Sequence, residues 1–266
     1  MSEPDLLDLR NQNALVTGAG QSAGRAIALT LARHNAGVAV NDFVRERADA
    51  VVAEIKALGG RAVTVQADVG DLEAVRASVK AATDQLGPVT LLVNNAGNAG
   101  PNASMGHSPF FWDTDPSEWD RYFRTNVQGV MNCCHAAIPG MIAQGGGRIV
   151  TIVSDAGRVG EARLAVYSAA KAGAAGFVRA LAREVGRHNI TCNAVSLSSL
   201  EPPMEPDALA AFLASDAAKT IASRYTIRRM GKPDDVAAMA LFLCSDASSW
   251  ITGQTYPVNG GYSFAV

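Results

Sequence analysis

The segment "NALVTGAGQSAG", residues 13–24, decides the fold, because a short apolar run passes through a glycine-rich turn into an alanine-rich stretch. A strand, such a turn and a helix let backbone N–H groups approach a pyrophosphate at the helix N-terminus. The spacing departs from G-x-G-x-x-G, since Gly18 and Gly24 stand six residues apart with Gly20 between them. Taken alone the turn is weak evidence, and an ordinary connection is a fair alternative.

The same alternation of strand and helix continues along the chain. Short β-branched runs predict seven strands, at residues 13–20, 37–42, 61–68, 89–97, 147–154, 190–196 and 251–261. Helical patterns lie near residues 22–36, 45–58, 71–86, 117–143, 166–187 and 233–245. Several strands are apolar throughout, which is typical of a parallel sheet covered on both faces. We therefore expect an α/β, doubly wound (Rossmann-type) seven-stranded parallel sheet in a single domain, residues 1–266.

Composition excludes several classes of partner. The 23 basic and 25 acidic side chains nearly balance, so no footprint for nucleic acid or an anionic membrane is expected. The start, "MSEPDLLDLR", has no apolar signal core, and the longest apolar run, residues 236–244, is too short to cross a bilayer. Neither cysteines nor histidines show the spacing of a disulfide framework or a metal site. These residues are Cys133, Cys134, Cys192, Cys244, His34, His107, His135 and His188. We expect a cytoplasmic protein with buried reduced thiols and no structural metal.

A carboxylate follows the second predicted strand. Asp42 lies 24 residues after Gly18, where an acid hydrogen-bonds the ribose hydroxyls of an adenosine. It would also repel a 2′-phosphate, and Gln21 gives the turn no basic group for that phosphate. The sequence therefore favours NAD over NADP. Arg45 and Arg47 stand just beyond, where they either soften this preference or simply begin a solvated helix.

A tyrosine and a lysine stand four residues apart in "VYSAAKAG", residues 166–173. In a helix this spacing places Tyr167 and Lys171 on one face, in or beside an apolar stripe. A lysine is seldom fully buried unless it is paired. The pair alone is more typical of a lysine packed along a ring, so a functional role needs partners from elsewhere in the chain.

Those partners are present, and together the motifs resemble the classical short-chain dehydrogenase/reductase (SDR) superfamily over nearly the whole chain. The matching stretches are "TGAGQSAG" at 17–24, Asp42, "ADV" at 67–69, "NNAG" at 94–97, Asn126 in "RTNVQG", Ser154, "YSAAK" at 167–171 and "RRMGKPDDVAAMALFLCSDASSWITGQTYPVNGG" at 228–261. Ser154 precedes Tyr167 by 13 residues, the interval usual in the family. The motifs are weak one by one, but their shared order is specific.

The resemblance implies four catalytic residues. Tyr167 would exchange a proton with the substrate oxygen, and Ser154 would hold that oxygen. Lys171 would hydrogen-bond the nicotinamide ribose and lower the pKa of the phenol, and Asn126 would anchor a water leading to solvent. A phenol working near neutral pH needs a pKa about three units lower, or about 4 kcal/mol. A positive charge at ~4 Å supplies energy of that order at an effective dielectric of ~20, so Lys171 together with the charge on oxidised nicotinamide would account for the shift.

The resemblance also implies cofactor contacts. Asp68 and Val69 would flank the adenine, and Asn95, Ala96 and Gly97 would line the ribose. The complete set of predicted cofactor-binding residues is Gly18, Gly20, Gln21, Ser22, Ala23, Gly24, Asp42, Phe43, Asp68, Val69, Asn95, Ala96, Gly97, Tyr167, Lys171, Leu197, Leu200 and Pro202.

Two departures from the family pattern concern the cofactor. Ser22 replaces the second glycine of T-G-x-x-x-G-x-G, where a serine serves if its φ is negative. After the sixth strand, Leu197-Ser198 replaces the usual Pro-Gly, and Pro202 stands where a Thr contacts the carboxamide. These changes bear on cofactor affinity and nicotinamide orientation, whereas the four catalytic positions are intact and favour an active enzyme.

The substrate side is less specific. The loop 98–120 carries Met105, Phe110, Phe111 and Trp112, which form either an aromatic plug or an added wall of the substrate pocket. Residues 203–228 match the family's substrate lid, and "DALAAFLASDAAKTIASRY", 207–225, predicts a helix with Leu209, Phe212 and Leu213 on one side. An apolar lid suits an apolar or bulky substrate.

The stretch "SDAGRVGEARLAVYSAAKAG", residues 154–173, resembles a subgroup acting on hydroxyacyl-CoA thioesters. Arg158 and Arg163 would then contact a CoA phosphate, or they are exposed loop arginines. We expect an NAD-linked oxidoreductase for a hydrophobic or cyclic hydroxyacyl-CoA. An NADPH-dependent 3-oxoacyl-thioester reductase and a catalytically weak nucleotide-binding homologue stay open, as do sugar alcohols, steroids and small ketones. The resemblance implies a homotetramer formed through 117–143, 166–187 and the last strand, and here both helical ranges and the end "YSFAV" carry apolar residues.

Overall fold

The computed structural model describes residues 5–97 and 109–264, and a seven-stranded, entirely parallel sheet forms its centre. The strand order is β3-β2-β1-β4-β5-β6-β7. The strands are β1 (Asn13–Val16), β2 (Gly37–Val40), β3 (Arg61–Thr64), β4 (Leu91–Asn94), β5 (Gly147–Ser154), β6 (Ile190–Leu197) and β7 (Thr255–Val258). All seven predicted strands are confirmed, each shorter than or close to its predicted range.

Ten α-helices connect the strands within the described residues. They are α1 (Ser22–Arg33), α2 (Arg45–Ala57), α3 (Leu72–Leu86), α4 (Asp120–Phe123), α5 (Gly129–Ala143), α6 (Ala156–Val159), α7 (Ala165–Val185), α8 (Pro206–Ala214), α9 (Asp216–Ala222) and α10 (Pro233–Cys244). The single-turn helix α6 was not predicted.

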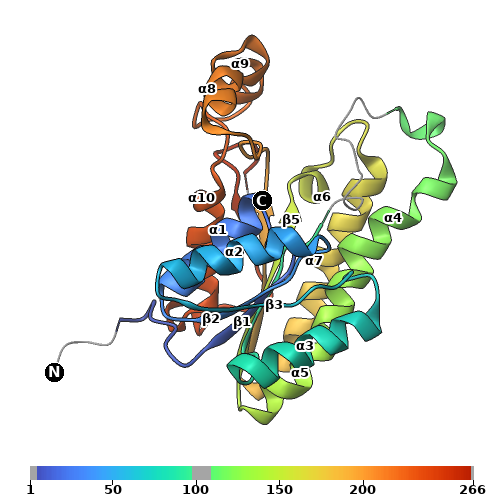
Figure 1. Ribbon diagram of the computed structural model, residues 1–266. Coiled ribbons are helices and arrows are strands. Elements are labelled where there is room, and N and C mark those ends of the chain that lie inside the picture. The colour runs from blue at the N-terminus through green and yellow to red at the C-terminus, as the bar shows by residue number, and fades with distance from the viewer. Residues whose placement is uncertain (1–4, 98–108, 265–266) are drawn as a thin grey trace.

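Helices cover both faces of the sheet (Figure 1). Residues of α1, α2 and α10 share one hydrophobic cluster with the sheet, and residues of α3, α5 and α7 share the other. The chain leaves β1 toward β2 and β3, then returns to β4 on the other side of β1. This reversal makes the carboxyl ends of β1 and β4 the switch point, where doubly wound sheets bind ligands.

Two predicted helices differ in detail. The range 117–143 is not one α-helix, because a π-helical turn, Arg124–Gln128, separates α4 from α5. The range 207–225 breaks at Ser215, whose backbone is extended and whose Oγ accepts the Ala218 N–H to begin α9. Helices α8 and α9 stand apart from the sheet at the top of Figure 1.

The cysteines agree with the prediction, since all four are free and buried. In residues 5–97 and 109–264, no group of three or more His, Cys, Asp and Glu side chains is placed to hold a metal ion. Over the same residues, no helix combines the length and apolar character needed to span a membrane.

Candidate active site

The glycine-rich turn is fixed against the end of β4. Asn95 Nδ2 donates to the carbonyls of Thr17 and Gly18 at 3.0 and 2.9 Å. Thr17 Oγ1 accepts the amides of Asn95 and Ala96, both at 3.0 Å. Gly18 has φ 58°, and a Cβ atom there would lie 2.9 Å from Ala96 Cα. At Gly24 a Cβ would lie 2.2 Å from the Gly18 carbonyl oxygen, so both positions require glycine.

The first turn of α1 is left open to an anion. Gln21 is its N-cap but makes no side-chain capping bond, and no acidic residue lies in the first turn. The initial N–H groups of such a helix, together with its dipole, attract a phosphate. Ala23 is buried behind this turn. The residues therefore fit the pyrophosphate of a dinucleotide.

Ser22 does not have the negative φ that would allow a serine to replace the glycine at this position. Its φ is 47°, in the left-handed region, and not negative. The turn demands the conformation that a glycine adopts freely, so the serine bears strain of about 1 kcal/mol. The backbone path of the turn is thus retained in spite of the substitution.

Asp42 lies just after β2 and contacts the glycine-rich turn. Its Oδ2 accepts the Gly20 amide at 3.0 Å, and its Oδ1 accepts the Val44 amide at 2.9 Å. The side chain is buried, whereas the neighbouring Phe43 is 52% exposed. Asp42 therefore orients the turn, and its contact with a ribose stays a prediction.

Asp68 has a partner that no local pattern indicated. Its Oδ2 pairs with Arg124 Nη2 at 2.8 Å, and its Oδ1 accepts the Gly70 amide at 2.8 Å. Val69 is buried against Gly129, where a Cβ would lie 2.6 Å from Val69 Cγ2. The ion pair ties the predicted adenine site to the π-helical turn.

Three of the four predicted catalytic residues gather beyond the end of β5. Tyr167 and Lys171 lie on α7, and Ser154, the last residue of β5, hydrogen-bonds the Tyr167 phenol. Lys171 Nζ lies 5.9 Å from the centroid of the Tyr167 ring. It is buried and donates to the Ile152 carbonyl at 3.0 Å, so this lysine does not simply extend to solvent.

Asn126 completes the group from the π-helical turn. It is fully buried, and its Nδ2 donates to the Tyr122 carbonyl at 2.8 Å. A Cβ atom at Gly97 would lie 2.9 Å from Lys171 Nζ and 3.1 Å from Asn126 Oδ1. The absence of a side chain at Gly97 thus leaves the space that Lys171 and Asn126 share.

Burial shifts the pKa values of both Tyr167 and Lys171. Burial raises the pKa of Tyr167 above 10, and the hydrogen bond with Ser154 offsets only part of that effect. Burial lowers the pKa of Lys171 to about 8. The predicted fall in the phenol pKa counts on the charge of oxidised nicotinamide as well as on Lys171, so it stays a prediction, and burial of the phenol opposes it.

The buried lysine predicts a pH-dependent stability. The pKa of Lys171 is about 8 in the folded protein and 10.5 when unfolded. Between these values the unfolded chain binds more protons, so this group destabilises the fold fully below pH 8 and progressively less above it. Lys171→Met should therefore gain stability relative to wild type, and the gain should shrink by about 2 kcal/mol from about pH 7 to about pH 10. Urea unfolding across that range measures the difference, and a constant difference would contradict the burial.

The segment after β6 is held by a tyrosine that sequence reasoning missed. Ser198 Oγ hydrogen-bonds the Tyr225 hydroxyl at 2.8 Å, and the Ser199 amide donates to the same oxygen at 3.0 Å. Leu197 and Leu200 pack against the hydrophobic core, and Pro202 is half-buried. The two leucines thus contribute to packing, and the predicted cofactor contacts of Leu197, Leu200 and Pro202 stay predictions.

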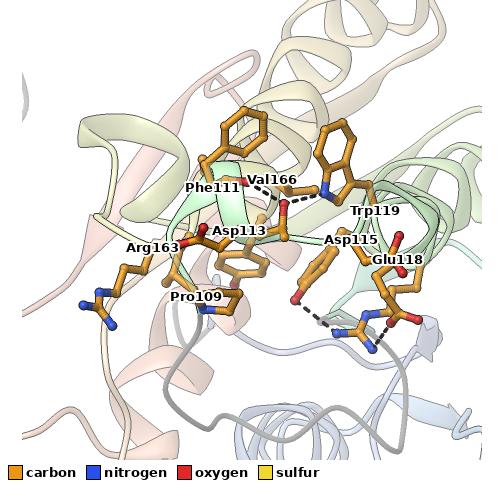
Figure 2. Close-up of a pocket in the computed structure, with 14 residues that line it drawn as sticks. Pro109, Phe111, Asp113, Asp115, Glu118, Trp119, Arg163 and Val166 are labelled. Atoms are coloured by element: carbon orange, nitrogen blue, oxygen red, sulfur yellow. Dashed lines mark hydrogen bonds and ion pairs between the residues drawn. The ribbon is translucent and has the colours of Figure 1, made fainter.

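A cavity of about 270 Å³ lies beside Tyr167 (Figure 2). The segment after residue 108 supplies one wall, in which Phe111 stacks on Trp119 with ring centroids 5.3 Å apart. The Tyr122 ring meets the Tyr167 ring edge-on at 6.5 Å. The cavity is also lined by carboxylates and arginines, namely Asp113, Asp115, Glu118, Arg121 and Arg163.

The other aromatic residues of this segment face outward. Phe110 stacks on Trp112 at 4.8 Å, Arg163 lies 4.2 Å above the Phe110 ring, and Trp112 is 76% exposed. Met105 lies outside the described residues. The segment therefore combines a cavity wall with an exposed aromatic pair.

The two arginines proposed for a CoA phosphate differ in environment. Arg158 is engaged by Asp155 at 3.0 Å and donates to Ser263 Oγ at 3.1 Å. It is therefore a structural arginine and not an exposed loop residue. Arg163 is exposed beside the cavity.

Comparison with known proteins agrees with this geometry. A family model described as Enoyl-(Acyl carrier protein) reductase matches residues 18–263. The 3-oxoacyl-[acyl-carrier-protein] reductase FabG of Staphylococcus aureus is 39% identical over 251 residues, which cover 94% of this chain and 97% of that protein. The 7alpha-hydroxysteroid dehydrogenase of Escherichia coli is 35% identical over 261 residues, covering 98% of each protein.

Solved structures give the same result. A 7 alpha-hydroxysteroid dehydrogenase complexed with NADH and 7-oxo glycochenodeoxycholic acid matches with a TM-score of 0.86 at 35% identity, over 98% of both chains. A gluconate 5-dehydrogenase from Burkholderia cenocepacia, in complex with NADP and tartrate, matches with a TM-score of 0.86 at 28% identity, over 98% of this chain and 99% of that one. The chain belongs to the short-chain dehydrogenase/reductase superfamily, whose members are NAD(P)-dependent oxidoreductases acting on CH–OH groups.

Proposed function

We propose that the protein interconverts a secondary alcohol and a ketone with NAD(H), on a hydrophobic or cyclic hydroxyacyl-CoA. The observation that carries the proposal is the grouping of Ser154, Tyr167 and Lys171 beside an aromatic-walled cavity. The open N-terminus of α1 and the glycines beneath it fit the dinucleotide. When bound, the nicotinamide supplies the hydride chemistry.

The chain's own residues hold the substrate and move the proton. Tyr167 transfers a proton to or from the substrate oxygen, while Ser154 donates a hydrogen bond that stabilises charge developing on it. Lys171, buried against the Ile152 carbonyl, keeps its ammonium close to the phenol. Asn126 adjoins the same space at Gly97, where it would anchor a water that connects Lys171 to solvent.

The NAD preference rests on Asp42, and the solved relatives do not decide it, because one holds NADH and another NADP. A buried carboxylate against Gly20 repels the 2′-phosphate of NADP. Asp42→Asn removes the charge and keeps one acceptor oxygen, with the loss of the hydrogen bond from either the Gly20 or the Val44 amide. We expect NADPH to bind about 10-fold more tightly to this variant, with NADH affinity reduced less than about threefold. Fluorescence titration measures both, and an unchanged NADPH affinity would count against Asp42 as the selector.

The substrate class rests on the cavity and on the lid. The cavity beside Tyr167 has aromatic walls suited to a ring or a bulky acyl group. The lid, residues 203–228, contains α8 and α9, and its Leu209, Phe212 and Leu213 are half-buried. Of the two arginines considered for a CoA phosphate, Arg163 is exposed beside the cavity, whereas Arg158 pairs with Asp155. A screen of cyclic and straight-chain hydroxyacyl-CoAs with NAD⁺ tests the proposal.

A second candidate, an NADPH-dependent 3-oxoacyl-thioester reductase, is favoured by the 39% identity to FabG. Turnover of 3-oxoacyl thioesters with NADPH, and none with NADH, would select it. A third candidate, a nucleotide-binding protein with weak catalysis, is motivated by Ser22 and the Leu197-Ser198 departure.

The exposed Met131 and Ile142 of α5 support a homotetramer, and four free buried cysteines support a cytoplasmic location.

A further inference from the structure

A buried carboxylate directly follows the proposed catalytic serine. Asp155 is 1% exposed, and its amide donates to the Leu197 carbonyl at 2.8 Å, which extends the pairing of β5 with β6. A charge at such a depth is costly unless hydrogen bonds satisfy it. A carboxylate at this depth therefore requires hydrogen-bond donors around it.

Four donors from three other parts of the chain surround this carboxylate. Oδ1 accepts from Ser196 Oγ at 2.7 Å and from Arg158 Nη1 at 3.0 Å. Oδ2 accepts from Asn259 Nδ2 at 2.5 Å and from Ser263 Oγ at 2.9 Å. Both oxygens are thus saturated, and the orientation of the side chain is fixed.

The two residues that follow Asp155 contact the proposed catalytic groups. The Ala156 amide donates to Ser154 Oγ at 3.2 Å, so the first residue of α6 orients the serine hydroxyl. A Cβ at Gly157 would lie 2.9 Å from Lys171 Cβ, so the backbone of α6 packs directly on α7. A shift of α6 would therefore change the position of Ser154 relative to Lys171.

The same network fastens the C-terminal segment, residues 259–264, to this turn. Beside the bonds of Asn259 and Ser263, the Tyr262 hydroxyl donates to Glu161 Oε2 at 2.5 Å. The segment also reaches the base of the lid, because the Ile227 amide donates to the Gly260 carbonyl at 2.9 Å. One continuous set of bonds thus joins the serine turn to the lid.

We propose that Asp155 is a positioning residue, which holds Ser154 in register with Tyr167 and anchors the C-terminal segment, with the base of the lid, to the serine turn. The inference rests on the proposed function, in which Ser154 holds the substrate oxygen. Asp155 does not touch the substrate. It acts through α6 and the C-terminal segment.

Steady-state kinetics of Asp155→Asn with a substrate of the wild-type enzyme test the proposal. The amide keeps the shape but turns one acceptor into a donor facing donors. We expect kcat to fall about 10-fold or more, KM for the ketone to rise, and NADH affinity to stay within about twofold. With 4-deuterated NADH, the isotope effect on kcat should increase, because a misplaced serine slows the chemical step. Loss of folded protein alone would lower the active fraction and leave the isotope effect unchanged.

Ser263→Ala removes one donor without stranding a charge and covers the case in which Asp155→Asn fails to fold. We expect a smaller fall in kcat, about threefold, with the same rise in isotope effect. Asp246→Asn is the control. Asp246 pairs with Arg148, which lies at the end of β5 opposite to Ser154, so this variant should keep wild-type kinetics. Wild-type kcat and isotope effect in folded Asp155→Asn, or in Ser263→Ala where the first variant does not fold, would overturn the proposal. Ser154→Ala separates the two claims, because wild-type turnover in that variant overturns the proposed function as well.

Discussion

Replacing Tyr167 by phenylalanine is expected to lower kcat by about 1,000-fold or more, with NADH affinity changed less than about threefold. The phenol is the proton-transferring group that Ser154 hydrogen-bonds, and the centroid of its ring lies 5.9 Å from Lys171 Nζ. Phenylalanine keeps the ring, and with it the edge contact to Tyr122, so packing changes little. Turnover with the best substrate of the screen, together with fluorescence titration of NADH, measures both quantities.

Tyr256→Phe is the matched control for this variant. Tyr256 lies on β7 and packs against the hydrophobic core, away from the proposed proton path. It should keep kcat within about twofold of wild type. Equal losses in the two variants would show that removal of a hydroxyl acts through stability. Full activity in Tyr167→Phe would remove this residue from the mechanism.

The second large effect is expected from Gly24→Ala. In the first turn of α1 an alanine gains about 1 kcal/mol of helix propensity. Steric overlap outweighs this gain, because the new Cβ would lie 2.2 Å from the Gly18 carbonyl oxygen and 2.4 Å from Asn95 Nδ2. We expect the free energy of unfolding to fall by about 3 kcal/mol and NADH affinity to fall about 100-fold. Urea unfolding and NADH titration measure the two effects.

Gly140→Ala supplies the control for the steric argument. Gly140 lies inside α5, and its Cβ would meet nothing within 4 Å. The same substitution should therefore raise the free energy of unfolding by about 0.5–1 kcal/mol and leave NADH affinity unchanged. If both glycine variants behave alike, close packing of the turn is not what Gly24 provides.

Much of the fold was predictable, because each step rests on local patterns. Seven short apolar runs separated by helical stretches specify a parallel sheet, and the strand order places the ends of β1 and β4 side by side. The residues expected at that edge lie there, where Asp42 accepts a hydrogen bond from the Gly20 amide and Asn95 donates one to the Gly18 carbonyl. The spacing of Tyr167 and Lys171 required a helix, and α7 provides it.

The unpredicted features depend on contacts between distant residues or on burial. Arg124 pairs with Asp68, which is 56 residues away in the sequence, and Ser263 hydrogen-bonds Asp155, which is 108 residues away. No pattern in the sequence marks either pair. The raised pKa of Tyr167 follows from desolvation, which only the packed structure sets. The requirement of a negative φ for Ser22 rests on the backbone preference of serine alone, whereas the surrounding turn fixes its φ at 47°.

The most direct test of the central claim is fluorescence titration of the purified protein with NADH and, separately, with NADPH. The open first turn of α1 and the carboxylate of Asp42 predict NADH binding in the micromolar range, and NADPH binding at least about 10-fold weaker. Absence of binding by either nucleotide at about 1 mM would contradict the claim that these residues form a working dehydrogenase site.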